Sequence, residues 1–251
     1  RGMARSRQQA AELIAAGSVK VNGQPAVKPS SLVDTADPVV VIDGAAKQYV
    51  SRGAHKLLGA LETFCPQGLE VAGRRCLDAG ASTGGFTQVL LEAGAAEVVA
   101  VDVGYGQLAW RLRTDDRVQV HDRTNVRNLT PDDIGGVASL IVADLSFISL
   151  RLVLPALLAC AEPHGDVLPM VKPQFEVGRE QLGSGGVVRE PRRRAEAILS
   201  VSAAAAELGW GLAGISPSPL PGPAGNREFF LWLRADAAPA VEEDVMRLVQ
   251  A

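Results

Sequence analysis

Four charged residues, Lys56, Asp144, Lys172 and Glu228, lie in or beside apolar runs of the sequence. Asp144 and Lys172 each follow directly on such a run, Glu228 begins another, and Lys56 lies in a segment with apolar residues at helical spacing. Because ligands bind outside the carboxyl ends of parallel strands, Asp144 and Lys172 would project towards a ligand. Each residue alone is most simply a strand-end charge in water. Two lysines and two carboxylates around one pocket, however, could position and deprotonate an alcohol nucleophile.

A glycine-rich turn follows the apolar run that ends at Asp78. A dinucleotide-binding fingerprint would place glycine at positions 80, 82 and 85, but position 82 is Ser. Glycines allow a ligand to approach the backbone closely, whereas the carboxylate of Asp78 would repel a pyrophosphate. Asp102 ends the next apolar run, where a carboxylate can accept hydrogen bonds from ribose hydroxyls. The pattern therefore favours a cationic nucleoside without phosphate, such as S-adenosylmethionine, while NAD or a purely structural turn stay open.

From residue 74 onwards, short apolar runs alternate with amphipathic segments, which predicts strands alternating with helices. The predicted strands cover residues 75–78, 97–102, 118–120, 140–144, 167–171, 211–216 and 228–233. Helices are predicted over residues 51–64, from residue 85 onwards, and over 107–112, 150–161 and 193–208. Nearly all-apolar strands imply a mostly parallel sheet with both faces covered, and therefore an α/β fold. The long connection from Pro173 to Pro191 is glycine-rich, and loops of this length are usually functional or mobile.

The first 56 residues form a basic segment, with eight Lys or Arg against four acidic residues. The rest of the chain has 17 basic and 24 acidic residues, a net charge of −7. The pattern of this segment predicts a helix over 6–17 that stops at Gly17. It also predicts a strand from Val19 to an Asn22-Gly23 turn and a further strand over 38–42. The asymmetry suggests a basic binding module on an acidic body, although a solvated basic surface is an equally good interpretation.

The composition excludes several classes of protein. With 47% hydrophobic and 21% charged residues among 251, the chain has enough apolar side chains to fill a core and is not disordered. The three cysteines form no close pair, which indicates reduced thiols, and no histidine lies at ligand spacing from another, so no metal site is expected. The most apolar stretch, residues 137–161, is interrupted by Asp144 and Arg151, which argues against a membrane-spanning helix. With no signal peptide visible, we expect a soluble, cytoplasmic protein.

The N-terminal segment resembles an S4 RNA-binding domain. The matching residues are Ser6-Arg7, Ala10, Leu13-Ile14, Gly17, Val19, Val21-Asn22-Gly23 and Lys28-Pro29. The resemblance implies that four basic residues contact RNA phosphates: Arg5, Arg7, Lys20 and Lys28. Such contacts release counterions and give affinity without sequence preference. The family usually begins with a further helix, which we expect to be short or absent in this chain.

The glycine-rich turn resembles the cofactor signature of class I methyltransferases. The resemblance implies that the methionine end of S-adenosylmethionine is lined by the residues of the turn: Asp78, Gly80, Ser82, Thr83, Gly84 and Gly85. It implies that Asp102 holds the ribose and that Asp122 lies on the adenine side. Further cofactor contacts are expected from Tyr105, Gly106 and Asn125.

The residues Lys56, Asp144, Lys172 and Glu228 resemble the Lys-Asp-Lys-Glu tetrad of ribose 2'-O-methyltransferases related to FtsJ. Together with the S4-like segment, they make the chain similar to the TlyA family of 16S/23S rRNA 2'-O-methyltransferases, historically called hemolysins. The strings that carry this resemblance are Ser51-Arg-Gly-Ala-His-Lys-Leu57, Leu77-Asp-Ala-Gly-Ala-Ser-Thr-Gly-Gly-Phe86, Asp102-Val-Gly-Tyr-Gly-Gln-Leu108, Ala143-Asp-Leu-Ser-Phe-Ile-Ser149, Val171-Lys-Pro-Gln-Phe-Glu176 and Gly225-Asn-Arg-Glu-Phe-Phe230.

The family resemblance implies both an architecture and an activity. The architecture is an S4-like α+β RNA-binding domain over residues 1–43, a linker over 44–50, and a Rossmann-like class I methyltransferase domain with a mostly parallel seven-stranded sheet over 51–251. The activity is S-adenosylmethionine-dependent 2'-O-methylation of cytidine in 16S rRNA, 23S rRNA or both, in ribosomal subunits, with Arg123 and Phe147 as further RNA contacts. Lys172 would be the general base or, if it keeps its proton, the group that stabilises the developing alkoxide, and the sequence leaves these two roles open.

Two other functions are alternatives. A membrane-active, hemolysin-like protein would agree with the historical family name, but the acidic body would be repelled by anionic lipid. A non-catalytic RNA-binding protein on the same fold is disfavoured because all four residue types of the tetrad are present. No motif indicates which rRNA is modified or the oligomeric state.

Overall fold

The computed structural model describes residues 3–4, 6–15, 18–26, 28–31, 33–34, 36–41, 49–178 and 182–250. The chain divides into two compact units, residues 1–48 and 49–251, each with a sheet of its own. Tyr49 and Val50, which the sequence places in the linker, belong to the second unit. The Tyr49 hydroxyl donates to Glu92 at 3.4 Å and the Val50 amide donates to Gln88 at 2.9 Å, which fastens both residues to that unit.

Within its described residues, the first unit consists of one helix and three short strands: α1 (Arg7–Ala15), β1 (Val19–Val21), β2 (Gln24–Pro25) and β3 (Val39–Val41). Strand β1 lies between β2 and β3 and is antiparallel to both. Asn22 and Gly23 connect β1 to β2 with φ values of 52° and 78°, which is the tight hairpin turn that an Asn-Gly pair favours. The predicted helix, turn and third strand are confirmed, and β2 was missed. Gly17, the predicted helix stop, lies outside the described residues.

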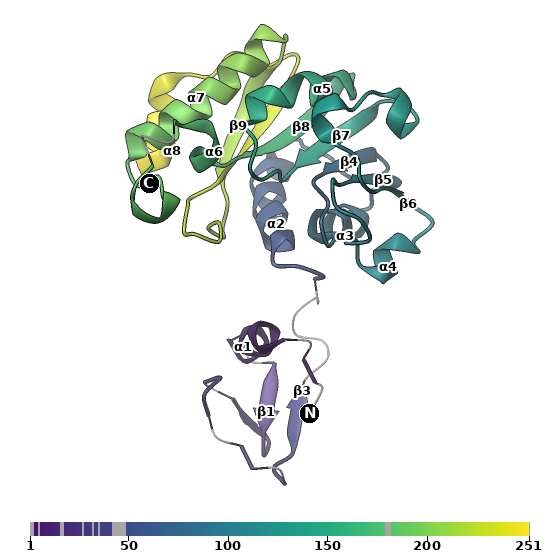
Figure 1. Ribbon diagram of the computed structural model, residues 1–251, viewed down its shortest axis with the longest axis vertical. Helices are drawn as coiled ribbons and strands as arrows, with labels where there is room; N and C mark the ends of the chain where they lie inside the picture. Colours follow the sequence, from purple (N-terminus) through teal and green to yellow (C-terminus); the bar gives the residue numbers. More distant parts are fainter. Residues whose placement is uncertain are drawn as a thin grey trace. The chain divides into compact units, whose positions relative to one another are not determined.

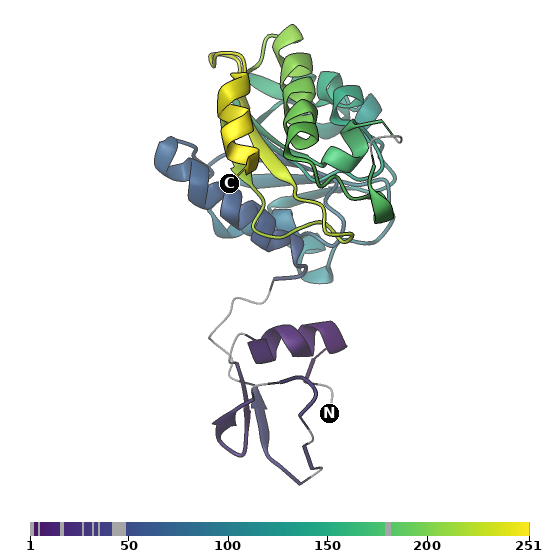
Figure 2. The same cartoon turned by 90° about the vertical axis from the view of Figure 1, so that its left-hand side faces the viewer.

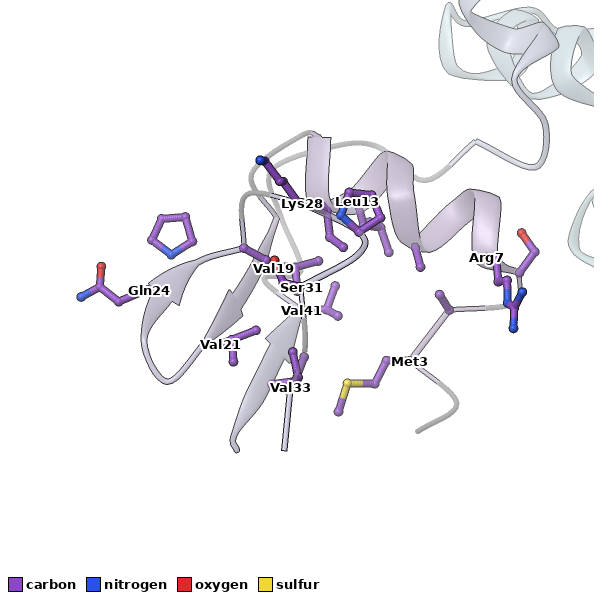
Figure 3. A pocket seen from close by; sticks show the side chains of 18 residues that line it. Met3, Arg7, Leu13, Val19, Val21, Gln24, Lys28, Ser31, Val33 and Val41 are labelled. Carbon is purple, nitrogen blue, oxygen red and sulfur yellow. The ribbon is translucent and has the colours of Figure 1, made fainter. Parts of the chain in front are cut away.

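An apolar cavity of about 620 Å³ lies between α1 and the sheet of the first unit (Figure 3). Leu13 lines it from the helix, and Val19 and Val41 line it from the strands. Arg7 and Lys28, two of the predicted phosphate contacts, also line it. One helix and three short strands bury little apolar surface, and this agrees with the small core expected for a module of this size.

A seven-stranded sheet forms the centre of the second unit (Figure 1). Its strands are β4 (Arg75–Ala79), β5 (Glu97–Val101), β6 (Val118–His121), β7 (Ala138–Ala143), β8 (Ala161–Val171), β9 (Gly211–Pro217) and β10 (Phe229–Arg234). They lie in the order β6-β5-β4-β7-β8-β10-β9, and among these seven strands only β10 runs opposite to the other six. The predicted mostly parallel sheet is therefore confirmed. The chain order reverses between β4 and β7, which is where open α/β sheets bind their ligands.

Helices cover both faces of this sheet (Figures 1 and 2). One face carries α2 (Gly53–Phe64) and α3 (Gly85–Glu92), and the other carries α5 (Leu154–Ala159), α7 (Pro191–Glu207) and α8 (Glu242–Gln250). Neighbouring residues of a strand point into different cores. Cys76 and Val98 pack in the cluster with α2 and α3, whereas Leu77 and Val99 pack in the cluster with α5, α7 and α8. This two-residue period explains why the strands are apolar throughout.

Short helical segments complete the second unit, and some of them differ from the predictions. They are α4 (Trp110–Arg113), α6 (Pro173–Glu176), η1 (Cys65–Gln67), η2 (Val126–Asn128), η3 (Asp132–Ile134), η4 (Leu150–Leu152) and η6 (Ser184–Gly186). The helix expected over 150–161 is split into η4 and α5, because Pro155 fits the first turn of a helix but not its interior. Helix α8 was not predicted. None of the helices within the described ranges has both the length and the apolarity needed to cross a bilayer.

Candidate active site

The four charged residues singled out in the sequence meet in one cluster, called the tetrad below. The Lys172 Nζ atom lies 2.6 Å from Asp144 Oδ1, and the Lys56 Nζ atom lies 3.7 Å from Asp144 Oδ2. Lys56 Nζ also donates a hydrogen bond of 2.6 Å to Glu228 Oε2. The four side chains therefore form a continuous chain of ion pairs in the order Lys172, Asp144, Lys56, Glu228.

The topology of the sheet brings the tetrad together from distant parts of the sequence. Asp144 directly follows β7, and Lys172 directly follows β8 and precedes α6. Glu228 directly precedes β10, which is antiparallel to β8. Because Phe229 lies opposite Val171, the first residues of β10 lie at the edge of the sheet where β8 ends. Lys56 comes from α2 on one face of the sheet (Figure 1). All four residues thus reach the carboxyl edge that the parallel strands share.

The tetrad is mostly shielded from solvent. Lys56 and Lys172 are each 6% exposed and Glu228 is 1% exposed, whereas the Asp144 side chain is 20% exposed. Buried charges need partners of opposite sign, and two lysines balance two carboxylates here. Glu228 Oε1 has no hydrogen-bond partner among the described residues, so its pairing with Lys56 depends on the other oxygen. Asp144 is the member that solvent reaches most readily.

Several residues that the sequence analysis did not single out hold the tetrad in place. Ser146 Oγ accepts a hydrogen bond of 2.8 Å from Lys172 Nζ. Asn226 is buried, and its side chain accepts from the Val188 amide at 2.8 Å and donates to the Gly186 carbonyl at 3.0 Å. This bonding ties the segment before Glu228 to the connection between β8 and α7. No spacing rule would have found Ser146 or Asn226, because each acts through contacts across the fold.

Two glycines lie close to the tetrad. Gly80 has φ +88°, and a Cβ atom there would lie 2.7 Å from the Asp144 carbonyl oxygen. The glycine-rich turn and the tetrad are therefore in direct backbone contact, which the sequence could not show. A Cβ atom on Gly222 would lie 2.5 Å from Glu228 Oε1, so this glycine leaves room for the catalytic candidate.

The remaining glycine-turn residues differ in their exposure. Asp78 is fully buried, and its Oδ2 accepts a hydrogen bond of 2.6 Å from the Thr87 hydroxyl. Burial raises the pKa of Asp78 to about 7, although the Thr87 hydrogen bonds act in the opposite direction. Ser82 and Thr83 are exposed, whereas Gly84 in the turn and Gly85 at the start of α3 are buried. Asp78 thus faces the interior, and the exposed edge of the turn is formed by its neighbours.

Asp102 is held by the backbone at the end of β5. Its Oδ2 accepts from the Ser82 amide at 2.8 Å and its Oδ1 accepts from the Gly104 amide at 2.7 Å. Asp122 at the end of β6 accepts from Arg113 at 2.9 Å and from the Gly106 amide at 3.2 Å. Burial acts to raise the pKa of Asp122, but these hydrogen bonds hold that pKa below its ordinary value. Both carboxylates are fixed and partly exposed beside the glycine-rich turn.

Two exposed aromatic side chains lie near these groups. The Arg123 guanidinium lies 4.3 Å from the centroid of the exposed Tyr105 ring, and Arg123 has a positive φ of 56°. Phe147 is 92% exposed with φ +64°, and its ring lies 5.3 Å from that of Phe175. Positive φ is unfavourable for such large side chains, so the loop holds Phe147 outward at a cost. Asn125 accepts from the Arg127 amide and caps η2.

The predicted RNA contacts of the first unit lie apart from these groups in the sequence. Arg7 begins α1, Lys20 is on β1, and Lys28 follows β2. Arg7 and Lys28 are exposed and Lys20 is half-buried. Arg5 lies outside the described residues.

Comparison with known proteins identifies the family. The profile of the FtsJ-like methyltransferases matches residues 49–235, and that of the S4 domain matches residues 1–39. The 16S/23S rRNA (cytidine-2'-O)-methyltransferase TlyA of Mycobacterium tuberculosis is 59% identical over 99% of this chain and 94% of its own length. The 23S rRNA (cytidine-2'-O)-methyltransferase TlyA of Campylobacter jejuni is 35% identical over 90% of this chain and 93% of its own.

A solved structure agrees with these relatives. It is that of a protein provisionally named a hemolysin, from Streptococcus thermophilus, and it is 40% identical to this chain with a TM-score of 0.78. The match covers 99% of this chain and 90% of that protein. Since relatives at this identity match along the whole length, and since both family profiles occur in the same chain, this protein belongs to the TlyA family of FtsJ-like methyltransferases.

Proposed function

We propose that this chain transfers the methyl group of S-adenosylmethionine to the ribose 2'-oxygen of cytidine in 16S and 23S rRNA. The observation that carries the proposal is the convergence of Lys56, Asp144, Lys172 and Glu228 at the carboxyl edge of the sheet, in backbone contact with Gly80. The family uses S-adenosylmethionine and modifies rRNA, which gives the class of reaction.

The residues beside the glycine-rich turn fit the proposed cofactor. Asp102 is held by two backbone amides while still partly exposed, which is the arrangement that a carboxylate needs to accept bonds from ribose hydroxyls. Ser82 and Thr83 present the exposed edge of the turn to the methionine end, with Gly80, Gly84 and Gly85 giving close backbone approach. Asp122 and Asn125 would lie on the adenine side. Tyr105 and Gly106, in the loop between β5 and α4, would add further contacts. Asp78 would support the turn through Thr87 from inside.

The tetrad would orient the ribose and manage the proton of its hydroxyl. When bound, the cofactor supplies an electrophilic methyl group, so alignment of the 2'-oxygen with that group is the main task of the protein. The Lys172 ammonium has three N–H bonds and donates one of them to Ser146, while the Asp144 carboxylate lies 2.6 Å from its nitrogen as an ion-pair partner. A further N–H bond would contact the 2'-oxygen and stabilise its developing negative charge. As a neutral amine, Lys172 would instead accept the hydroxyl proton.

Methyl transfer by variants of Lys172 tests this assignment. Tritiated S-adenosylmethionine would be incubated with the full-length chain and with 30S or 50S subunits that lack the modification. Lys172→Ala should lower the turnover by about 100-fold or more while the affinity for S-adenosylmethionine stays within about threefold. Lys172→Arg separates the two roles, because a guanidinium can stabilise an alkoxide but cannot act as a base at neutral pH.

A matched lysine variant in the first unit controls for loss of positive charge. Lys28→Ala should raise the KM for ribosomal subunits and leave the turnover at saturation unchanged, because Lys28 is proposed to contact phosphate and to take no part in the chemistry. Full activity of Lys172→Ala would overturn the proposal. Absence of transfer by the wild-type chain, with tight binding of subunits, would favour a non-catalytic RNA-binding protein.

The rRNA substrate follows from the first unit and from the relatives. Arg5, Arg7, Lys20 and Lys28 would neutralise phosphates, assisted by Arg123 and Phe147 beside the reaction site. The Mycobacterium relative is named for both 16S and 23S rRNA, and the Campylobacter relative for 23S rRNA alone. Because this chain is more similar to the former, we propose that it modifies both subunits, in the cytoplasm where subunits are assembled. The separate 30S and 50S reactions test this directly.

The hemolysin name of the Streptococcus relative supports a membrane-active protein as a second candidate function. It predicts that the pure protein releases a dye from vesicles of phosphatidylcholine and phosphatidylglycerol at physiological salt. Leakage by both the wild-type chain and Lys172→Ala would establish that activity independently of methyl transfer. Intact vesicles would remove this candidate.

A further inference from the structure

Three arginines from separate elements come close together beside the start of β10. A cavity of about 490 Å³ is lined by Arg227, which precedes β10, and by Arg247 of α8, together with Pro217, Asp244 and Leu248. Arg194, near the start of α7, is tied to the same segment through Val188. Its guanidinium donates to the Val188 carbonyl, and the Val188 amide donates to the side chain of Asn226, the residue directly before Arg227. Three guanidinium groups therefore share one region of an otherwise acidic unit.

Two of these three arginines have no carboxylate partner among the residues that the structure describes. Within the described part of the chain, no carboxylate lies within 4.0 Å of the guanidinium nitrogens of Arg194 or Arg227. Arg194 donates to the Val188 carbonyl at 3.0 Å, and the Arg227 guanidinium lies 6.0 Å from the centroid of the Phe229 ring. Arg247 does pair with Asp244, at 3.2 Å, but both side chains are largely exposed. Like charges held together in this way favour an anionic ligand.

The arginines lie at the same edge of the sheet as the reaction site. Arg227 is the residue directly before Glu228, and Phe229 pairs with Val171, the residue directly before Lys172. Phe229 also pairs with Pro217, which lines the cavity. A polynucleotide whose ribose reached the tetrad would therefore extend past this region with its phosphates. A guanidinium presents a fork of N–H donors that matches a phosphate group.

We propose that Arg194, Arg227 and Arg247 form a phosphate-binding site for the RNA backbone that flanks the methylated nucleotide. This inference rests on the proposed function, because it takes RNA to be the substrate. Arg227 and Arg247 contact phosphate oxygens directly, and Arg194 adds positive charge from α7. Asp244 gives up its exposed pairing with Arg247 when a phosphate is bound. The site positions the strand and does not read bases, as is usual for phosphate contacts.

The test is the salt dependence of binding to ribosomal subunits. The full-length wild-type chain, Arg227→Ala, Arg247→Ala and the double variant would be titrated against unmodified 50S and 30S subunits between 50 and 300 mM KCl. Removal of each arginine–phosphate interaction should reduce the slope of log affinity against log salt by about 0.7 to 0.9. At 100 mM KCl, the affinity of the double variant should fall by about 10-fold or more.

Arg234→Ala is the matched control, because Arg234 ends the strand that Arg227 precedes and so lies at the opposite edge of the sheet. It should leave the slope unchanged. Arg227→Lys keeps the charge and should restore most of the slope that Arg227→Ala removes. The melting temperature and the affinity for S-adenosylmethionine should not change in Arg227→Ala, Arg247→Ala or the double variant. These readouts separate phosphate binding from an indirect effect on Glu228, which would lower the turnover at saturating subunits.

The outcomes distinguish this site from the proposed function. Methyl transfer by the wild-type chain, combined with an unchanged slope and affinity in the double variant, would overturn the phosphate site alone. A reduced slope in the double variant, combined with no methyl transfer by the wild-type chain, would overturn the proposed function and leave the phosphate site standing. A slope reduced equally by Arg234→Ala would show a general charge effect and would also overturn the site.

Discussion

Removal of either partner of the Lys56–Glu228 pair should destabilise the second unit, and the two losses should be unequal. Glu228 is 1% exposed, and Lys56 is its only ion-pair partner among the described residues. Lys56→Met therefore leaves a buried carboxylate without a cation. Glu228→Gln leaves the Lys56 ammonium with a second carboxylate, that of Asp144 at 3.7 Å. The structure thus predicts that Lys56→Met is the more harmful change.

The magnitude follows from the distances. With an effective dielectric constant of about 20, unit charges at the 2.6 Å separation attract by about 6 kcal/mol, and those at 3.7 Å by about 4.5 kcal/mol. Desolvation offsets much of this, and loss of one partner of a buried pair typically costs about 3 to 5 kcal/mol. We expect about 5 kcal/mol for Lys56→Met and about 3 kcal/mol for Glu228→Gln. The double variant should cost less than the sum by about 1 to 3 kcal/mol.

The assay is urea unfolding of the full-length chain, followed by tryptophan fluorescence. All three tryptophans, Trp110, Trp210 and Trp232, lie in the second unit, so the signal reports on that unit. The exposed pair Arg192–Glu196 of α7 is the control, with an expected coupling of about 0.5 kcal/mol or less. A coupling between Lys56 and Glu228 as small as the control, or a larger loss for Glu228→Gln than for Lys56→Met, would refute this reasoning.

Three further predictions concern single residues around the site. Burial raises the pKa of Asp78 to about 7, so its contribution to stability is full below about pH 4 and is lost as the pH rises through about 7. In urea unfolding this loss should amount to about 2.5 kcal/mol for the wild type between pH 5 and pH 8, and Asp78→Asn should remove it. A pH dependence equal to that of the wild type would contradict it. Gly222→Ala places a Cβ atom 2.5 Å from Glu228 Oε1 and should lower the turnover by about 10-fold or more with cofactor affinity intact, as measured by methyl transfer and calorimetry. Asp102→Ala removes the acceptor proposed for the ribose and should weaken S-adenosylmethionine binding by about 10-fold or more in calorimetry, whereas an unchanged affinity would exclude that role.

The fold could be predicted largely because its strands are apolar on both faces. The Cys76–Leu77 pair shows why: one side chain packs under α2 and α3 and the other under α5 and α7, so neither position tolerates a polar residue. The Asn22-Gly23 turn was equally clear, because both residues adopt positive φ. Helix α8 escaped prediction because its first turn is acidic and only Val245 and Val249 are buried in it.

The candidate site could be predicted as a set of residues but not as a set of contacts. Sequence pattern places Asp144 and Lys172 at strand ends, yet the bond from Lys172 to Ser146 depends on how the following loop turns. That loop is fixed by Glu176 of α6, which accepts from Ser149 at 2.6 Å and from the Leu150 amide at 2.7 Å. The inward orientation of Asp78 was likewise hidden, because spacing does not show which way a strand-end side chain points.

The tetrad is proposed to direct methyl transfer to a ribose oxygen. Mass spectrometry of nucleosides tests it most directly, after 30S and 50S subunits are incubated with S-adenosylmethionine and the full-length chain. The wild-type chain should produce 2'-O-methylcytidine, and Lys172→Ala should produce it at least about 100-fold more slowly. A methyl group on a base, or equal ribose methylation by Lys172→Ala, would contradict it.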